Sequence, residues 1–382
     1  MRTRIAVIAL VALALDIGAA SAADTAKRNE DCFHRVLLCG ETIGGELTNR
    51  DCAFSDGSFG DRWFMASSEG MSVELTAATQ GFTARLFLSG DAIDAQTVSP
   101  SAPAVAHATC SRPGGCPAFS ALMASSPATG NALGGYSLSL SCNIARPCAT
   151  PQVWHACAGY GANNPPPTRF LVQAAFRGPE SGHEGVGLSA TFGPAFLGTY
   201  TSFPNEGLSL VTKFFEHPDR VELRYIQMTD LSYRLAVTDR ATQQTRVYRN
   251  TENPCGDDTR YTFAAAEGPG SCRQYRRGRF NPYIGCYLDS RFAVELVWTH
   301  PVSGKTGKGR NFGNRIAFTK VTDLQVFLRF VPSEDQVRFE FASLSDWAYT
   351  LKVTDTLTGE VRTYENPAGR VCAVVDPDVF GD

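Results

Sequence analysis

The residue types that could carry out catalysis are scattered singly along this sequence. Of six histidines, the one in the most suggestive context is in Gly182-His183-Glu184. A zinc-peptidase helix of the form H-E-x-x-H requires a second histidine at position 187, where the chain has Gly187. There is no G-x-S-x-G nucleophile elbow, and spacing singles out no Ser-His-Asp set. The sequence therefore predicts a protein that is not an enzyme, and no catalytic residue is nominated.

Twelve cysteines favour disulfide bonds over metal or thiol chemistry. Trp154-His155-Ala-Cys157 places a cysteine near a histidine, but an even cysteine count in an exported chain predicts a disulfide there. No C-x2-C spacing of the kind that holds zinc occurs. Close spacings predict small local loops, although the pairing stays open: Cys32 with Cys39, Cys110 with Cys116, Cys142 with Cys148, and Cys272 with Cys286.

Two short acidic pairs could be considered for calcium. Asp56 and Asp61 form one, and Asp91 and Asp94 form the other. Calcium takes six to eight oxygen ligands, whereas each pair offers two carboxylates. Aspartate also stabilises turns through its own backbone, which is the simpler account of these positions. We therefore expect no metal site and no cofactor.

The strongest chemical signal is a basic region. From Arg273 to Lys320 there are ten Lys or Arg residues against Asp289 and Glu295. Guanidinium groups present planar donors that suit carboxylate, sulfate and phosphate groups. This pattern predicts a patch that binds an anionic polysaccharide or an acidic cell-surface protein; a solvated linker followed by an exposed hairpin is the alternative. The candidate ligand-binding residues are Arg273, Arg276, Arg277, Arg279, Lys305, Lys308 and Arg310.

The N-terminal residues resemble a cleaved export signal. Arg2 and Arg4 precede an apolar stretch over residues 5–15, and Ala20-Ser21-Ala22 supplies small residues for cleavage. Eleven apolar residues are too few for a membrane span, which needs about 20. We therefore expect a secreted protein without a membrane span. The formal net charge of −3 also argues against a nucleic-acid partner.

Beyond residue 22, the chain shows short runs with the alternating pattern of half-buried strands. Arg220-Val-Glu-Leu-Arg-Tyr225 and Ala293-Val-Glu-Leu-Val-Trp298 are examples, and Gly, Pro, Asn and Asp bound such runs. Many strands of this kind predict an all-β protein made of β-sandwich domains. The expected divisions are a signal peptide (1–22), a first sandwich (32–143), a Pro-rich linker (144–168), a second sandwich (169–254), an Arg/Gly-rich linker (255–285) and a third sandwich (286–382).

The second and third sandwiches are predicted to be copies of one another. Val237-Thr-Asp239 recurs as Val353-Thr-Asp355, 116 positions later, and Arg169-Phe170 recurs as Arg291-Phe292, 122 positions later. The repeated phrase predicts a β-hairpin with a structural role. In its turn the first copy has Gln243 where the second has Gly359, so a strained or altered turn is expected in the first copy.

Part of the chain resembles a known family. The motifs are Ile43-Gly-Gly-Glu-Leu47, Asp61-Arg-Trp-Phe64, Gly70-Met-Ser-Val-Glu-Leu75, Phe82-Thr-Ala-Arg-Leu-Phe-Leu88 and Gly134-Gly-Tyr-Ser-Leu138. Through them, residues 41–142 resemble the bacterial pre-peptidase C-terminal (PPC) domain. That resemblance implies a jelly-roll-like β-sandwich with a non-catalytic accessory role. Residues 169–254 and 286–382 resemble an uncharacterised tandem repeat of secreted bacterial proteins, which implies two Ig-like sandwiches.

Together these patterns predict an exported, disulfide-containing, non-catalytic protein that acts in binding or adhesion outside the cytoplasm. The alternative is a secreted peptidase or glycosidase whose catalytic residues are dispersed over several strands and leave no local motif.

Overall fold

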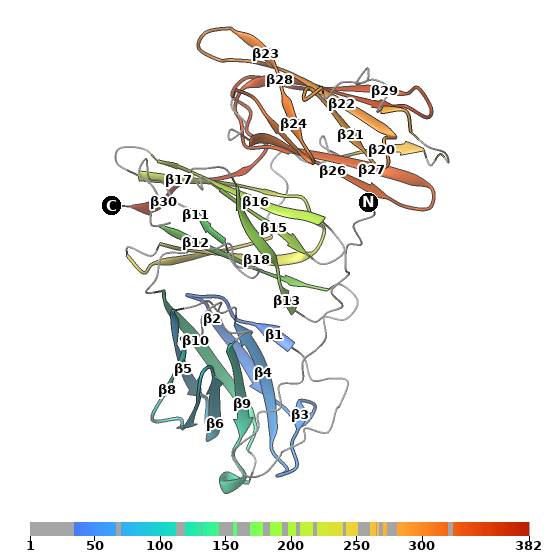
Figure 1. Cartoon of the computed structure of the whole chain (residues 1–382). Coiled ribbons are helices and arrows are strands. Elements are labelled where there is room, and N and C mark those ends of the chain that lie inside the picture. The colour runs from blue at the N-terminus through green and yellow to red at the C-terminus, as the bar shows by residue number, and fades with distance from the viewer. Residues whose placement is uncertain are drawn as a thin grey trace.

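The computed structural model is all-β, and Figure 1 shows three bodies stacked one above another. Apart from one short 3-10 turn at Pro127–Thr129, its regular elements are strands in the part of the chain that is described. The structure describes residues 34–65, 70–111, 119–130, 132–144, 156–158, 169–178, 184–192, 198–203, 207–216, 220–239, 242–250, 260–264, 266, 270–272, 281–319 and 324–381. The expected signal peptide lies outside these residues.

The strands of the first body form two sheets that pack as sandwich 1. One sheet has the order β1-β4-β9-β6-β7, with β3 beside β4, and the other has the order β2-β10-β5-β8. Their bounds are β1 (His34–Val36), β2 (Thr42–Leu47), β3 (Cys52–Ala53), β4 (Phe59–Met65), β5 (Met71–Thr79), β6 (Ala84–Ser89), β7 (Ile93–Val98), β8 (Ala104–Cys110), β9 (Phe119–Ser125) and β10 (Gly134–Ile144).

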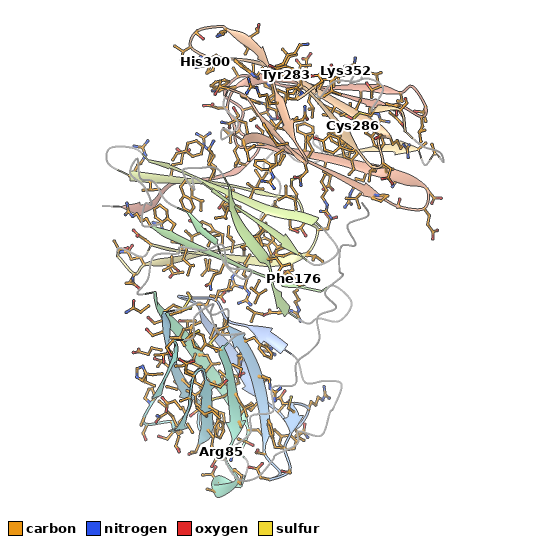
Figure 2. The ribbon with its side chains drawn as sticks, viewed as in Figure 1. Arg85, Phe176, Tyr283, Cys286, His300 and Lys352 are labelled. Carbon is orange, nitrogen blue, oxygen red and sulfur yellow. A yellow bond between two sulfur atoms is a disulfide. The ribbon has the colours of Figure 1, made fainter. Side chains whose placement is uncertain are left out.

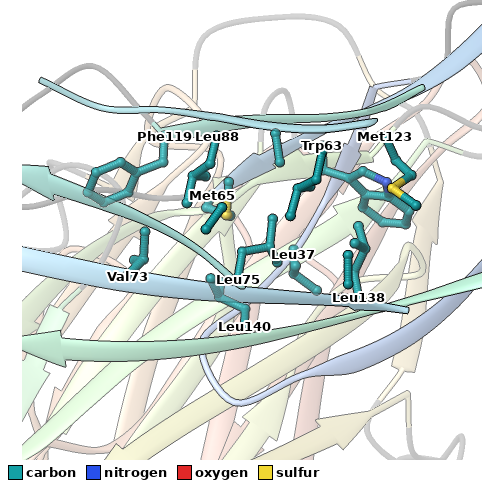
Figure 3. Close-up of a cluster of buried hydrophobic side chains, with 14 of the residues drawn as sticks. Leu37, Trp63, Met65, Val73, Leu75, Leu88, Phe119, Met123, Leu138 and Leu140 are labelled. Atoms are coloured by element: carbon teal, nitrogen blue, oxygen red, sulfur yellow. The ribbon is translucent and has the colours of Figure 1, made fainter. Parts of the chain in front are cut away.

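Alternating residues of both sheets fill the core of sandwich 1 (Figure 3). In β5, for example, Val73 and Leu75 are buried while Glu74 between them is exposed. The core also holds a polar chain, in which the Trp63 indole donates to the Tyr136 hydroxyl at 3.2 Å and that hydroxyl donates to Asp61. Burial raises the pKa of Asp61 despite the Tyr136 hydrogen bond.

The next two bodies, sandwich 2 and sandwich 3, each contain two five-stranded sheets. Sandwich 2 has β11-β12-β18-β19 with β13 beside β12, facing β14-β15-β16-β17-β30. Its strands are β11 (Ala156–Ala158), β12 (Phe170–Arg177), β13 (Glu184–Val186), β14 (Leu188–Phe192), β15 (Gly198–Phe203), β16 (Gly207–Glu216), β17 (Arg220–Gln227), β18 (Ser232–Asp239), β19 (Thr245–Arg249) and β30 (Val374–Gly381).

Sandwich 3 repeats this arrangement. It has β21-β22-β28-β29 with β23 beside β22, facing β20-β27-β26-β25-β24. Its strands are β20 (Arg260–Ala264), β21 (Ile284–Tyr287), β22 (Phe292–Thr299), β23 (Thr306–Lys308), β24 (Arg310–Phe312), β25 (Arg315–Ala317), β26 (Leu324–Pro332), β27 (Gln336–Ser343), β28 (Ala348–Asp355) and β29 (Val361–Asn366).

The strands of the two copies correspond at the offsets read from the sequence. The bounds of β18 and β28 differ by 116 at both ends, and those of β12 and β22 differ by 122. In each copy the repeated Arg and Asp meet: Arg169 lies 2.8 Å from Asp239, and Arg291 lies 2.7 Å from Asp355. Both aspartates are fully buried, so each pairing neutralises a carboxylate inside its sandwich. The repeated phrase thus has a structural role.

Strand pairing crosses the boundaries that the sequence predicted. β11 lies in the expected linker 144–168 but pairs with β12. β20 lies in the expected linker 255–285 and follows the strands of sandwich 2, yet it pairs with β27 of sandwich 3. β30 ends the expected third domain, yet it pairs with β17 of sandwich 2, as the red strand in the middle body of Figure 1 shows.

The two displaced strands are equivalent, so the copies exchange them. Phe263 of β20 is opposite Val337, and Phe380 of β30 is opposite Val221, which is the counterpart of Val337. Each strand thus completes the other copy's sheet at the same position and in the same direction. The arrangement is that of a strand-swapped dimer built within one chain.

Sandwiches 2 and 3 also pack together through matching residues. One buried cluster joins their faces, and each residue from sandwich 2 has its counterpart 116 positions later in the same cluster. The pairs are Leu208 and Leu324, Val211 and Phe327, Ile226 and Ala342, and Met228 and Leu344. The contact is therefore approximately two-fold symmetric.

Charges at the edge of this contact break its symmetry. Sandwich 2 has Glu222 and Arg224, 2.5 Å apart, where sandwich 3 has Arg338 and Glu340, 2.9 Å apart, so the signs are reversed. Arg338 also reaches Asp230 of sandwich 2 at 2.6 Å.

Two disulfides are described, and one corrects an expectation. Cys272 pairs with Cys286, as their spacing predicted. Cys39 pairs with Cys142, 103 residues away, so the expected local loops 32/39 and 142/148 are wrong. The reason is topological: Gly40 N donates to Leu140 O, which brings the segment after β1 beside the end of β10. Cys52, Cys110 and Cys372 are also disulfide-bonded.

Candidate functional site

The structure describes part of the predicted basic region. Arg273, Arg276, Arg277 and Arg279 lie outside the described residues. Lys305 and Lys308 are exposed, on the loop after β22 and at the end of β23, and Arg310 begins β24 half-buried. Between Glu295 and Asp323 the sequence has no acidic residue. This edge of sandwich 3 therefore carries positive charge without a carboxylate in the same stretch of chain.

The loop that presents Lys305 is held by His300. The backbone N–H of His300 bonds to the Lys305 carbonyl at 2.8 Å, and Gly304, at φ +65°, bonds back to the His300 carbonyl at 2.9 Å. The His300 ring nitrogen Nδ1 accepts from the backbone N–H groups of Val302 and Ser303, each at 3.2 Å. The His300 ring packs edge-on against the Trp347 ring, with the ring centroids 4.5 Å apart (Figure 2 labels His300). The loop is thus an ordered turn packed on the sandwich.

A glycine corner relates Lys308 to Arg310. At Gly309 the chain passes from one sheet of sandwich 3 to the other, from β23 to β24. A Cβ at Gly309 would lie 2.5 Å from the Ile316 side chain and 3.0 Å from that of Leu296, so only glycine fits without a shift. The two cations therefore flank one corner at the edge of the sandwich. Lysine at an edge strand also discourages edge-to-edge pairing, which gives Lys308 a structural role as well.

The sheet that carries Lys308 has an open outer face, called here the outer β22 face. Because Leu296 and Trp298 point into the core, the residues between them point outward. Val297 is 46% exposed, with Lys308 opposite it on one side and Thr350 on the other. The face consists of Glu295, Val297, Thr299, Thr306, Lys308, Thr350, Lys352, Thr363 and Glu365.

Lys352 is the second cation of this face, and Figure 2 labels it near the top of the molecule. Its amino group lies 3.8 Å from Glu295, and both side chains are close to half exposed. Such a solvated ion pair contributes roughly 0–1 kcal/mol. Lys352 is therefore available to another anion at little energetic cost.

The corresponding face of sandwich 2 is covered. At the positions of Val297, Lys308 and Lys352 it has Ala175, Val186 and Ala236. These residues pack with Val36 and Leu38 of sandwich 1 in one apolar cluster. The same face of the repeated fold is thus a docking surface in one copy and open in the other.

A buried ion cluster, called here the Arg234 clamp, locks that docked face. The Arg234 guanidinium bonds to Glu41 of sandwich 1 and to Glu184 of β13, each at 2.6 Å, and to the Val36 carbonyl at 2.7 Å. Glu184 also accepts from the Val36 N–H at 2.9 Å. Both carboxylates thus hold sandwich 1 against sandwich 2. The counterpart of Arg234 in sandwich 3 is Thr350, so no equivalent clamp forms there.

Sequence reasoning missed several of these residues. It considered Glu184 only beside His183, which lies outside the described residues, and it gave Lys352, Val297 and Arg234 no role. A signal was present, since aligning the two copies shows small apolar residues in one and lysines in the other. The sequence does not show, however, which face of the repeated fold sandwich 1 covers.

Asp56 serves a turn, as the sequence favoured, whereas Asp61 accepts from Tyr136 in the core, and Asp91 and Asp94 accept from backbone N–H groups of segments distant in the chain. Asp56 accepts from the Ser58 N–H at 2.9 Å and pairs with Arg85 at 2.7 Å, and Asp94 accepts from the His107 N–H at 2.8 Å. Among the described residues, no group of three or more His, Cys, Asp or Glu could hold a metal ion. In the same part of the chain, no helix has the length and hydropathy needed to cross a bilayer.

Comparison with known proteins finds one weak structural similarity. No family model matches the chain, and no curated protein matches it. Among solved structures, the chain is similar to the pre-peptidase C-terminal domain of collagenase from Bacillus anthracis. That match has 13% identity and a TM-score of 0.20, and it covers 28% of this chain and 94% of the other. At this TM-score the match carries no argument about the fold or function of this chain.

Proposed function

We propose that this is an exported, non-catalytic binding protein in which the outer β22 face, with Lys308 and Lys352, and the loop that carries Lys305 bind an anionic polymer. One observation carries the proposal. The fold uses the same face of sandwich 2 to dock another module through a carboxylate. In sandwich 3 this face is open and carries Lys308 and Lys352 in place of valine and alanine, beside Glu295 and Glu365, and the exposed Lys305 lies on the loop next to it. The disulfides support an oxidising compartment.

The side chains of this face suit a polymer that lies along the sheet and carries carboxylate or sulfate groups. Threonine hydroxyls and lysine ammonium groups donate hydrogen bonds, and Val297 offers an apolar contact between them. An acidic polysaccharide and an acidic protein segment share these groups. We expect Arg273, Arg276, Arg277 and Arg279 to add to the positive charge of the same sandwich.

Retention of residues 23–382 on immobilised alginate, heparin and poly-glutamate tests the proposal. We expect binding that weakens as salt is raised, and roughly tenfold weaker binding in Lys308→Glu. Arg50→Glu, which changes the charge equally on sandwich 1, is the matched control and should bind as the wild type does.

Three outcomes would overturn the proposal. One is no retention at low salt, and another is equal weakening by both variants. The third is release of sugar or peptide fragments from the immobilised polymers, which would favour the hydrolase alternative. Retention on the polysaccharides but not on poly-glutamate, or the reverse, identifies the class of partner.

A further inference from the structure

A second surface, on sandwich 2, has the form of a small-molecule site. A cavity of about 310 Å³ opens where β12, β18 and β19 reach one end of their sheet beside β13. This volume is at the lower end of the range for ligand pockets and suits a molecule of about one sugar ring. Figure 2 labels Phe176 at this position. The lining residues are Ala175, Phe176, Arg177, Glu184, Ser232, Tyr233, Arg234, Arg249 and Asn250.

The lining is rich in arginine. Arg234 and Arg249 occupy directly opposite positions on antiparallel strands, where like charges destabilise a sheet. The Arg234 clamp compensates the first of these charges with two carboxylates. Arg249 and Arg177 are exposed on the same face, at the ends of β19 and β12. An anion in the cavity would therefore meet two guanidinium groups at its opening.

The repeated fold does not require these arginines. The positions of Arg177 and Arg249 are occupied in sandwich 3 by Thr299 and Glu365. By contrast, Asn250 has Asn366 as its counterpart, and both side-chain amides donate to the carbonyl of the corresponding loop residue, Leu231 or Trp347. The asparagine therefore belongs to the scaffold, whereas the arginines are particular to this copy.

We propose that this cavity binds a small organic carboxylate, such as a uronic acid ring, with Arg177 and Arg249 as its charged contacts. Guanidinium groups bind carboxylates through two parallel hydrogen bonds. Ser232 also lines the cavity and is exposed, so its hydroxyl gives the ligand a further polar contact. The site lies on a different sandwich from the outer β22 face, and it takes one unit rather than an extended polymer.

Calorimetric titration of residues 23–382 with glucuronate, and with glucose as its uncharged match, tests this site. We expect glucuronate to bind and glucose not to bind. Arg249→Gln should weaken the binding roughly tenfold, since it removes a charge-assisted hydrogen bond. Arg246→Gln is the control, because Arg246 lies on the same strand, is exposed and does not line the cavity.

Equal binding of both sugars, equal weakening by the two variants, or no binding of glucuronate at millimolar concentration would overturn the proposal. A di- or trisaccharide of uronate that binds like the monomer places the site at a polymer end, and weaker binding of these longer probes indicates a free sugar acid. Lys308→Glu should leave glucuronate binding unchanged, so this result is independent of the test on sandwich 3.

Discussion

Deleting residues 374–382 should destabilise sandwich 2, although these residues follow sandwich 3 in the sequence. β30 aligns five residue pairs with β17. At roughly 0.5–1.5 kcal/mol net for each backbone hydrogen bond, and about one bond for each pair, their loss costs about 2.5–7.5 kcal/mol. A domain is commonly stable by only about 5–15 kcal/mol, so this loss is a large fraction of its stability. It also leaves β17 as an unpaired edge next to a large apolar cluster, which favours aggregation.

Hydrogen exchange measured by mass spectrometry distinguishes the two sandwiches. In the truncated protein we expect faster exchange in Leu210–Gln227, which contains β17 and most of β16, and little change in β27. A truncation that removes only Asp382 leaves β30 intact and is the control. A peptide of residues 373–382 added in trans should restore slow exchange, because it supplies the missing strand.

The reasoning is refuted if the truncation accelerates exchange mainly in β27 and β28 of sandwich 3. That result would mean that the chain closes each copy with its own strand. It is also refuted if exchange in β17 does not change, since an exposed edge cannot retain the protection that pairing provides.

Three further predictions concern single residues. Arg234→Ala should lower the free energy of unfolding by about 3–5 kcal/mol in urea titrations, because it leaves the buried Glu41 and the partly buried Glu184 without their cation; an effect below 1 kcal/mol would contradict the clamp. Gln243→Gly should raise the melting temperature, because Gln243 has φ +60° and a left-handed non-glycine residue costs roughly 1–2 kcal/mol; a fall would show that the Gln243 side chain contributes more than the strain costs. Burial opposes ionisation of Asp355, but the hydrogen bonds and charge of Arg291 outweigh it and lower its pKa below 3.8. As pH falls, Asp355 is therefore protonated in the unfolded chain before it is protonated in the folded protein. The stability that the Asp355–Arg291 pair contributes is complete above about pH 4 and is lost below it. Asp355→Asn should flatten that part of the pH profile, and an unchanged acid transition would contradict the assignment.

The strand exchange affects how the protein can be divided for experiments. A segment that ends at residue 254 lacks both the strand β20 and the incoming β30, so no strand covers the outer edge of β17, opposite β16. It also exposes Leu208, Val211, Ile226 and Met228, which pack against sandwich 3 in the whole chain. Binding experiments are therefore designed on residues 23–382.

Much of the local structure could be predicted from the sequence because its causes are local. Alternating side chains identify strands such as β17 and β27, since a sheet with one buried face imposes a period of two. The duplication was visible because each copy needs the same core residues at the same spacing. The strain at Gln243 was also predictable: its counterpart Gly359 has φ +77°, and Gln243 is held in the same left-handed region at φ +60°.

The candidate sites were less accessible, because charge density indicates cations and does not indicate their surroundings. Lys308 could be nominated from the basic stretch, whereas Lys352 is the single basic residue of β28. The arginines of the cavity are 72 positions apart, at Arg177 and Arg249, and they come together only through β12, β18 and β19. No local pattern contains that information.

By itself the sequence determined the all-β class, the repeat, its register and the core positions, because these follow from side-chain periodicity and from residue identity. Only the tertiary structure decided which strand completes which sheet, which cysteine pairs with Cys39 and which copy of the repeated face is covered. Each of these depends on contacts between segments far apart in the chain. β20 and β30 occupy equivalent positions in the two sheets, and nothing in either strand's own sequence specifies which of the two sheets it completes.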